Sequence, residues 1–225
     1  MATTSKKTTG KLCRLKNKTR ENWLKTRYEV NGVGASDAAC VVGESPWKSA
    51  SDFWKEKITG TRPKDISDDP FVQQGIRMEP ALRTLYKAKH PEYSVRHEPY
   101  DIWYRAGREW MFATLDGRII DKANKKKGIL EIKTSTPNGK TGWAKWDNQI
   151  PRNYYLQCLH ACTILDYDFI VLYAALINRD DDMTIREYRF EREDIQADMD
   201  WLLKKETEFW NSVQNRSIPP MTLVF

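Results

Sequence analysis

The chain has 225 residues, enough for one domain with a substantial buried core. It carries 37 Lys and Arg against 31 Asp and Glu, and the net charge of +6 suits a polyanionic partner as well as an ordinary soluble basic protein. A run of about eighteen apolar residues is absent from the sequence, which excludes a predicted membrane span. The four Cys and three His are too scattered for a disulfide scaffold or a zinc or iron–sulfur site, so we expect a cytoplasmic protein with reduced thiols.

The first residues predict an arm followed by a helix. Residues 1–16 are rich in Thr, Ser, Lys and Gly, which is typical of a basic flexible arm that either touches a nucleic-acid backbone or is simply solvated. Residues 17–225 are then expected to form a single folded domain. A helix is predicted over residues 17–30, with Trp23 and Leu24 among its apolar positions.

A glycine-containing turn follows that helix. Residues 31–37 read Asn-Gly-Val-Gly-Ala-Ser-Asp and lead into the apolar segment 38–42, so Ser36 or Asp37 is suited to cap a helix. Free backbone N–H groups at such a turn can also hold a phosphate, to which Arg27 could add a bidentate contact. An ordinary helix cap is the simpler interpretation of the spacing, and the phosphate site stays open as the alternative.

Two further helices are predicted, over residues 50–59 and 70–89. The first is ended by Gly60. Pro80 lies inside the second pattern and predicts a kink or a break near Glu79. Glu79 is either a third carboxylate for the site described next or a solvated charge on a helix. Strands are predicted after these helices, over residues 93–104 and 110–113.

The segment 113–134 is the one around which the rest of the chain is organised. Two short apolar runs flank a turn at residues 124–127, which indicates a β-hairpin. Asp116 stands at the head of one strand, while Glu131 and Lys133 lie two residues apart on the other and project from the same face. The hairpin therefore lets two carboxylates and an ammonium converge on one point.

Metal-assisted hydrolysis is the chemistry that such a trio suggests. Carboxylate oxygens suit Mg²⁺ or Mn²⁺, which polarise a phosphoryl oxygen and help to make hydroxide from water. A lysine beside the metal can orient or deprotonate that water and neutralise charge on the phosphate. The alternative is a surface hairpin whose charges are merely solvated. The apolar neighbours Ile129, Leu130 and Ile132 favour a functional site, because charges embedded in a hydrophobic strand require compensation.

The second half of the chain predicts a helix-covered sheet. A polar loop over residues 135–149 interleaves Lys140 and Lys145 with Trp143 and Trp146, which either stack on bases or pack in the core. The elements after this loop are a helix, two strands and a final helix, over residues 150–165, 169–177, 183–190 and 191–213. A Pro-containing apolar tail that could dock on the body or on a neighbouring subunit ends the chain. The order of elements predicts a mixed α/β fold with a central mixed sheet flanked by helices.

The motifs together resemble the PD-(D/E)XK nuclease superfamily, and within it the phage recombination exonucleases of the YqaJ and lambda-exonuclease type. The similarity runs from about Arg27 to Leu176. The motifs that carry it, in chain order, are Gly34-Ala35-Ser36-Asp37, Gly75-x-x-x-Glu79-Pro80, Leu115-Asp116-Gly117, Leu130-Glu131-Ile132-Lys133 and Tyr155-Leu156-Gln157. Two positions depart from the family pattern: Leu115 replaces a proline, and Thr114 stands where a serine is usual.

The resemblance implies a restriction-endonuclease-like core whose carboxylates hold metal. Asp116 and Glu131 would bind Mg²⁺, or Mn²⁺, helped by the backbone carbonyl of Ile132. Glu79 would hold a second metal or its water, so that two ions act in the working complex. None of these ligand positions departs from the family pattern.

The resemblance also assigns roles around the metal and at the DNA end. Lys133 would act on the nucleophilic water, and Gln157 would help to position it. Arg27, Ser36 and Thr114 would fall where the family grips a 5′-phosphate, which sets the scissile bond against the metals. The implied activity is a 5′→3′ exonuclease on linear double-stranded DNA, leaving 3′ single strands for phage-type recombination.

Further expectations concern partners. The resemblance implies a homotrimeric ring around DNA, a single-strand annealing protein as partner, and a phage or prophage gene expressed in a bacterial cytoplasm. Two other nucleases remain alternatives on the same core, a restriction-like endonuclease and a single-strand nuclease of the RecB type or of its CRISPR-associated relatives. The alternative from another class is a non-catalytic DNA-binding module, against which the intact carboxylates and lysine argue.

Overall fold

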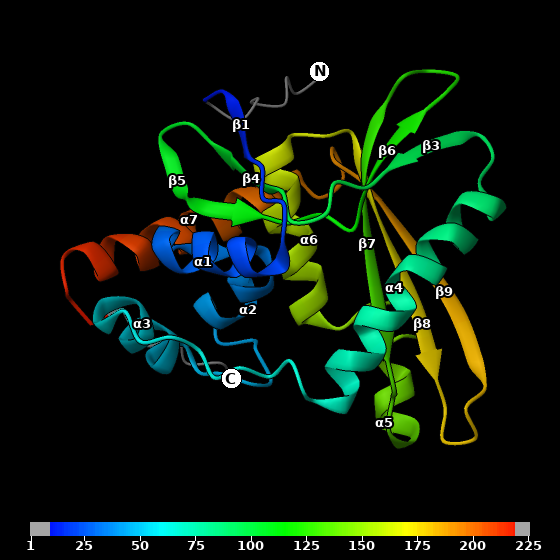
Figure 1. The fold of residues 1–225 in the computed structure, drawn as a ribbon, viewed down its shortest axis with the longest axis horizontal. Helices are drawn as coiled ribbons and strands as arrows, with labels where there is room; N and C mark the ends of the chain where they lie inside the picture. The colour runs from blue at the N-terminus through cyan, green and yellow to red at the C-terminus, as the bar shows by residue number, and fades with distance from the viewer. Residues whose placement is uncertain (1–9, 219–225) are drawn as a thin grey trace.

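Two mixed sheets with helices around them make up the computed structural model, which describes residues 10–218 (Figure 1). The predicted α/β class is confirmed, but the strands divide between two sheets instead of forming one. The division falls inside the strand predicted over residues 93–104. That segment forms two strands separated by a turn in which Tyr100 adopts a positive φ of 65°.

The larger sheet has five strands. In spatial order these are β3 (Tyr93–Arg96), β6 (Gly117–Asp121), β7 (Lys127–Ser135), β8 (Phe169–Ile177) and β9 (Met183–Glu191). Strands β6 and β7 pair antiparallel, which confirms the predicted hairpin, while β7 and β8 pair in parallel. The parallel pair sits at the centre of the sheet, and β8 is buried along its whole length, as its unbroken apolar sequence requires.

Alternation along β7 separates the two faces of this sheet. Leu130 and Ile132 pack in an apolar cluster with Leu82 and Tyr86 of α4 (Pro70–Lys89). Ile129, the residue before Leu130, belongs to the other cluster, with residues of α6 (Arg152–Leu165). Because side chains alternate between faces, Glu131 and Lys133 point to the α6 side.

Close packing explains the glycine at the second position of β7. A Cβ atom on Gly128 would lie 2.2 Å from the ring of Phe169, its partner on β8. Only glycine leaves room for that ring, which is completely buried. Strand β7 therefore packs closely against β8 at this position.

The smaller sheet has four strands, in the order β1 (Leu12–Leu15), β4 (Ile102–Arg105), β5 (Arg108–Ala113) and β2 (Val33–Gly34). Strand β1 corrects the prediction of a flexible arm over residues 1–16. Its residues pair antiparallel with β4, and the buried guanidinium of Arg105 binds the carbonyl of Gly10 at 2.8 Å. Residues 1–9 of the predicted arm and the tail at residues 219–225 lie outside the described residues.

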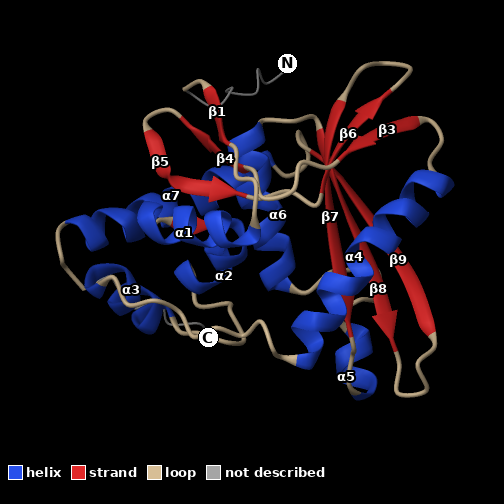
Figure 2. Ribbon diagram, viewed as in Figure 1, coloured by secondary structure: helices blue, strands red, loops and turns tan. Residues whose placement is uncertain are grey.

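The remaining elements are helical: α1 (Arg20–Val30), the short 3₁₀ turn η1 (Ala35–Asp37), α2 (Ala38–Val41), α3 (Ala50–Thr59), α5 (Gly139–Ala144) and α7 (Gln196–Gln214). Local chemistry sets several of the boundaries: Ser49 accepts a hydrogen bond from the N–H of Asp52 at the start of α3, and Gly60 ends that helix at φ 65°. Figure 2 shows α4 along one side of the larger sheet, α5 at the lower end of β7 and β8, α6 between the two sheets, and α1, α2, α3 and α7 on the side of the smaller sheet.

Three helix predictions need correction. Helix α4 has the predicted bounds, but of the predicted kink or break the break does not occur, because Pro80 is exposed and the buried side chains of Leu82 and Tyr86 anchor the following turns. The short helix α5 forms inside the predicted loop 135–149. The last helix begins at Gln196 because β9 and a turn occupy the residues before it. Within residues 10–218, no helix has the length and apolar character that a membrane span demands.

A buried ion pair joins α6, α7 and β5. His160 is fully buried, and its Nδ1 atom lies 2.6 Å from Oε1 of Glu206, which is equally buried. Its Nε2 atom lies 3.1 Å from the carbonyl of Phe112. Burial opposes charge on the imidazole, but Glu206 and the Phe112 carbonyl outweigh it and raise the pKa of His160. The second carboxylate oxygen of Glu206 has no hydrogen-bond partner among the described residues.

Candidate active site

Asp116, Glu131 and Lys133 meet as the hairpin predicts. Asp116 directly precedes β6, and its Oδ2 atom accepts a hydrogen bond of 2.7 Å from the backbone N–H of Ile132 on β7. One strand position to either side of Ile132, Glu131 and Lys133 share a face, and Lys133 Nζ lies 2.8 Å from Glu131 Oε1. The hairpin register thus fixes both carboxylates beside the ammonium.

Gln157 completes this arrangement from α6. Its side-chain amide donates to Glu131 Oε1 at 2.6 Å, and its carbonyl oxygen accepts from Lys133 Nζ at 2.9 Å. The three side chains therefore form a closed triangle of hydrogen bonds. This triangle leaves no freedom in the orientation of the amide, because both of its ends are used.

Glu79 approaches from α4 but is held by a residue that the sequence analysis overlooks. Arg83, one helical turn on, pairs with Glu79 and donates its Nε–H to the carbonyl of Asp116 at 2.7 Å. His97 Nδ1 contacts the same carbonyl at 3.0 Å. The i, i+4 spacing of Glu79 and Arg83 was a usable signal for the ion pair. Contacts to a distant backbone carbonyl leave no such signal in the sequence.

Burial and mutual repulsion shift the titration of these groups. Burial, reinforced by the charge of Glu79, raises the pKa of Asp116 to about 6. Burial also raises the pKa of Glu131 to about 7, although Lys133 opposes the change. The pKa of Glu79 is raised by burial against the opposing charge of Arg83. Burial opposes the charge of Lys133, but Glu131 and Asp116 outweigh it and raise the pKa of the lysine, which favours its protonated form.

The donor set fits a hard divalent cation. Asp116 and Glu131 bring carboxylate oxygens together in a buried place where their charge is only partly matched, and bound Mg²⁺ or Mn²⁺ would complete that balance. Among the described residues, no three or more His, Cys, Asp or Glu side chains are arranged as a metal cluster by themselves. The Glu79 carboxylate faces Arg83 in this arrangement, so it would have to turn to serve as a third ligand.

A second cluster of side chains lies around Thr114, two residues before Asp116. Arg27 of α1 lies with its guanidinium carbon 4.8 Å from the ring centre of Trp23 and 5.4 Å from that of Phe112. Trp23 also donates its indole N–H to the hydroxyl of Thr114 at 2.9 Å. Ser36 is exposed in η1. Trp23, which links two predicted phosphate-binding residues, was treated in the sequence only as an apolar helix position.

The two predicted DNA-binding lysines lie elsewhere. Lys140 is exposed within α5, and Lys145 is exposed just beyond its end. Neither makes a side-chain contact with the carboxylate site among the described residues. The sequence leaves open whether Trp143 and Trp146 stack on bases or pack in the core. Trp146 is 3% exposed and belongs to the core. Trp143 packs against the same core with part of its surface accessible.

The fold and the site define a class of protein. A mixed α/β core that sets Asp116, Glu131 and Lys133 around one point, beside a glutamine from a covering helix, is the architecture of the PD-(D/E)XK nuclease fold. The sequence pattern of the YqaJ-like viral recombinase domain family matches residues 22–168. The chain belongs to this family, as the motifs predict.

Known proteins show the same relationship. The chain is 28% identical over 198 residues to the uncharacterized protein YqaJ of Bacillus subtilis, and the match covers 85% of this chain and 56% of that protein. The chain thus spans just over half the length of this relative. The crystal structure of an alkaline exonuclease, LHK-Exo from Laribacter hongkongensis, matches 87% of this chain and 93% of its own, with a TM-score of 0.67 and 21% identity.

A phage-related exonuclease from Haemophilus somnus 129PT is also similar in structure. The TM-score is 0.53 at 13% identity, over 82% of this chain and 96% of that one. At identities this low, the two structural likenesses establish a shared fold. They leave the chemistry to be argued from the residues of this chain.

Proposed function

We propose that this chain is a metal-dependent exonuclease that degrades linear double-stranded DNA from its 5′ ends. The observation that carries the proposal is the hydrogen-bonded triangle of Glu131, Lys133 and Gln157 beside the half-buried Asp116. Buried, charged groups that satisfy one another around a point of converging carboxylates are suited to phosphodiester hydrolysis. The family membership and the fold of the exonucleases above support the same reaction.

The side chains divide the work. Asp116, Glu131 and the carbonyl of Ile132 would hold Mg²⁺ or Mn²⁺, which supplies Lewis acidity and an activated water when bound. Lys133 would orient or deprotonate the attacking water and neutralise charge on the phosphate. Gln157 fixes the Lys133 ammonium by accepting one of its hydrogen bonds.

The direction of digestion, from the 5′ end, would be set by the cluster around Arg27. Arg27 forms no ion pair or side-chain hydrogen bond with the described residues, yet two aromatic rings hold its guanidinium in place. A fixed guanidinium with unused donors is prepared for a phosphate. Thr114 lies two residues before Asp116, so a 5′-phosphate held by Arg27, Thr114 and Ser36 would set the adjoining strand against the carboxylates.

We extend the proposal to the assembly on grounds of family resemblance. The chain forms a homotrimeric ring around duplex DNA, uses two metal ions, and passes its 3′ single strand to an annealing protein. It acts in the cytoplasm of a bacterium that carries the phage or prophage gene. The exposed Lys140 and Lys145 contact the DNA backbone outside the reaction centre.

The first test is digestion of linear duplex DNA labelled at either end, beside a closed circle, with Mg²⁺ and with EDTA. We expect metal-dependent loss that starts at 5′ ends and spares the circle. Cutting of the circle would instead identify an endonuclease, and digestion only of a single-stranded oligonucleotide, included as a third substrate, would identify a RecB-type enzyme. DNA binding without any cutting would identify a non-catalytic module.

Arg27→Ala tests the end-recognition part separately. Because the substitution removes the fixed guanidinium, we expect the rate on 5′-phosphorylated duplex to fall about tenfold, toward the rate on 5′-hydroxyl duplex. Initial rates on the two substrates measure this. Lys25→Ala, an exposed change on the same helix, is the control and should keep the parent's preference. Equal rates on both ends by the parent protein would remove the pocket from the proposal.

A further inference from the structure

A cavity of about 320 Å³ lies between α1, η1, α3 and the segment that follows α3. Arg27 and Phe112 line it, and so does Lys57 of α3, but Glu131, Lys133 and Asp116 do not. The cavity is therefore an extension of the Arg27 cluster away from the carboxylates. Neither the sequence motifs nor the family comparison assigns a role to Lys57.

Lys57 is a buried cation with unused donors. Its side chain is 10% exposed, and its Nζ atom lies 4.8 Å from the centre of the Phe53 ring. Its nearest carboxylate oxygen is Glu56 Oε1 at 3.9 Å, beyond hydrogen-bond distance. No hydrogen bond to this ammonium is formed within the described residues. Burial lowers the pKa of Lys57 although Asp37 and Glu56 oppose the change, and an anion in the cavity would stabilise its charge.

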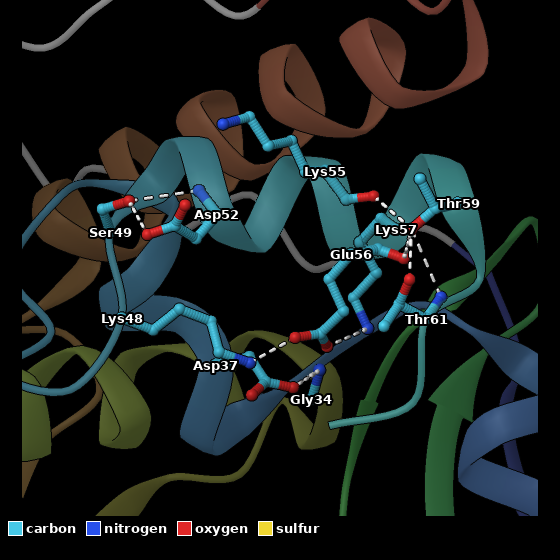
Figure 3. A network of polar contacts seen from close by, with 10 residues as sticks. All are labelled: Gly34, Asp37, Lys48, Ser49, Asp52, Lys55, Glu56, Lys57, Thr59 and Thr61. Carbon is cyan, nitrogen blue, oxygen red and sulfur yellow. Dashed lines mark hydrogen bonds and ion pairs between the residues drawn. The ribbon is translucent and has the colours of Figure 1, made fainter. Parts of the chain in front are cut away.

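Three carboxylates line the cavity: Glu29, which is exposed, and Asp37 and Glu56, which are engaged within the protein. Glu56 pairs more closely with Lys48 than with Lys57, as Figure 3 shows. Asp37 accepts a hydrogen bond of 3.2 Å from the N–H of Gly34. Both anions therefore serve the protein framework, while Lys57 and Arg27 keep donors directed at the cavity they share.

We propose that Lys57 is a second phosphate-binding residue, which acts with Arg27 to make this cavity selective for a phosphomonoester. A phosphomonoester carries a charge of about −1.5 to −2 at neutral pH, and so is matched by two cations where a phosphodiester needs one. The inference rests on the proposed function in one respect, the assignment of Arg27 to the DNA end. The ligand is the 5′-phosphate of a DNA strand or a free nucleoside 5′-monophosphate, which share this group.

The kinetic test compares 5′-phosphorylated with 5′-hydroxyl duplexes of one sequence. Lys57→Met keeps the length of the apolar stem and removes the charge, so we expect the preference for the phosphorylated end to fall about tenfold. Lys57→Arg keeps the charge and should retain most of the preference. Lys55→Met is the matched control, because Lys55 lies on the same helix and points away from the cavity (Figure 3).

A binding test works without catalysis. Calorimetric titration with dAMP, deoxyadenosine and a short oligonucleotide with or without a 5′-phosphate reads the cavity directly. We expect the parent and Lys55→Met to bind a phosphorylated probe about tenfold more tightly than Lys57→Met does, with all variants melting as cooperatively as the parent. Binding of dAMP would identify free monophosphate as a ligand, and binding of the phosphorylated oligonucleotide alone would identify the DNA end.

The two proposals fail differently. A parent protein that cuts no DNA but binds phosphorylated probes through Lys57 would overturn the nuclease and keep the cavity. A folded Lys57→Met protein with the parent's end preference and the parent's affinity for phosphorylated probes would overturn the inference, and leave the nuclease untouched.

Discussion

Glu131→Gln and Lys133→Ala are each expected to reduce metal-dependent DNA hydrolysis by at least about 100-fold. Glu131→Gln keeps the shape of the side chain and removes the charge that would hold the metal. Lys133→Ala removes the ammonium that Glu131 and Gln157 position. Initial rates on linear duplex, at saturating Mg²⁺, measure the loss.

The controls separate catalysis from folding. Glu131→Gln leaves the Lys133 ammonium without one of its counter-charges, so cooperative urea unfolding of each variant is measured beside its activity to show that the protein is folded. Lys127→Ala removes an exposed lysine at the start of the same strand and should keep full activity. Substantial hydrolysis by either site variant would show that the assigned residues are not the catalytic ones.

Glu206→Gln is expected to destabilise the fold by about 3 kcal/mol or more near pH 6, because it leaves a buried imidazolium without its counter-charge. The sign of the pH dependence follows from the raised pKa of His160. The stabilisation is fully present below the unfolded histidine pKa of about 6.5 and is lost as the pH rises through the higher folded value. Urea unfolding of parent and variant from pH 5.5 to 9 measures the difference.

The gap between the two stability curves should therefore narrow as the pH rises. Glu208→Gln, two positions along α7 and on its accessible side, should run parallel to the parent instead. A constant gap between the parent and Glu206→Gln would mean that His160 stays neutral in the folded protein throughout this range.

Short-range patterns predict much of this fold. The bounds of α3, α4 and β8 follow from capping residues, from a helical stripe and from an unbroken apolar run. Pairing between segments that are distant in the sequence is harder to predict. The partnership of β1 with β4 and the division of the strands into two sheets depend on contacts far apart in the sequence.

The candidate site likewise contains some residues that the sequence predicts and others that it does not. Asp116, Glu131 and Lys133 are close together because a hairpin is a local structure whose register can be read from the sequence. Arg83 and His97 meet at the backbone carbonyl of Asp116, which no side-chain pattern marks. The catalytic assignment of Glu131 and Lys133 stays a prediction until the Glu131→Gln and Lys133→Ala variants are measured.

The separation between the carboxylate site and the Arg27 cavity has a consequence for how such proteins diversify. Strand β7 is fixed between two packed faces and against the fully buried β8, so most substitutions there would harm folding and chemistry together. Arg27 and Lys57 lie in α1 and α3 instead, with the Trp23–Thr114 hydrogen bond as a described link toward Asp116. Substitutions in α1 and α3 are therefore free to change what the Arg27 cavity binds, while strand β7 stays unaltered.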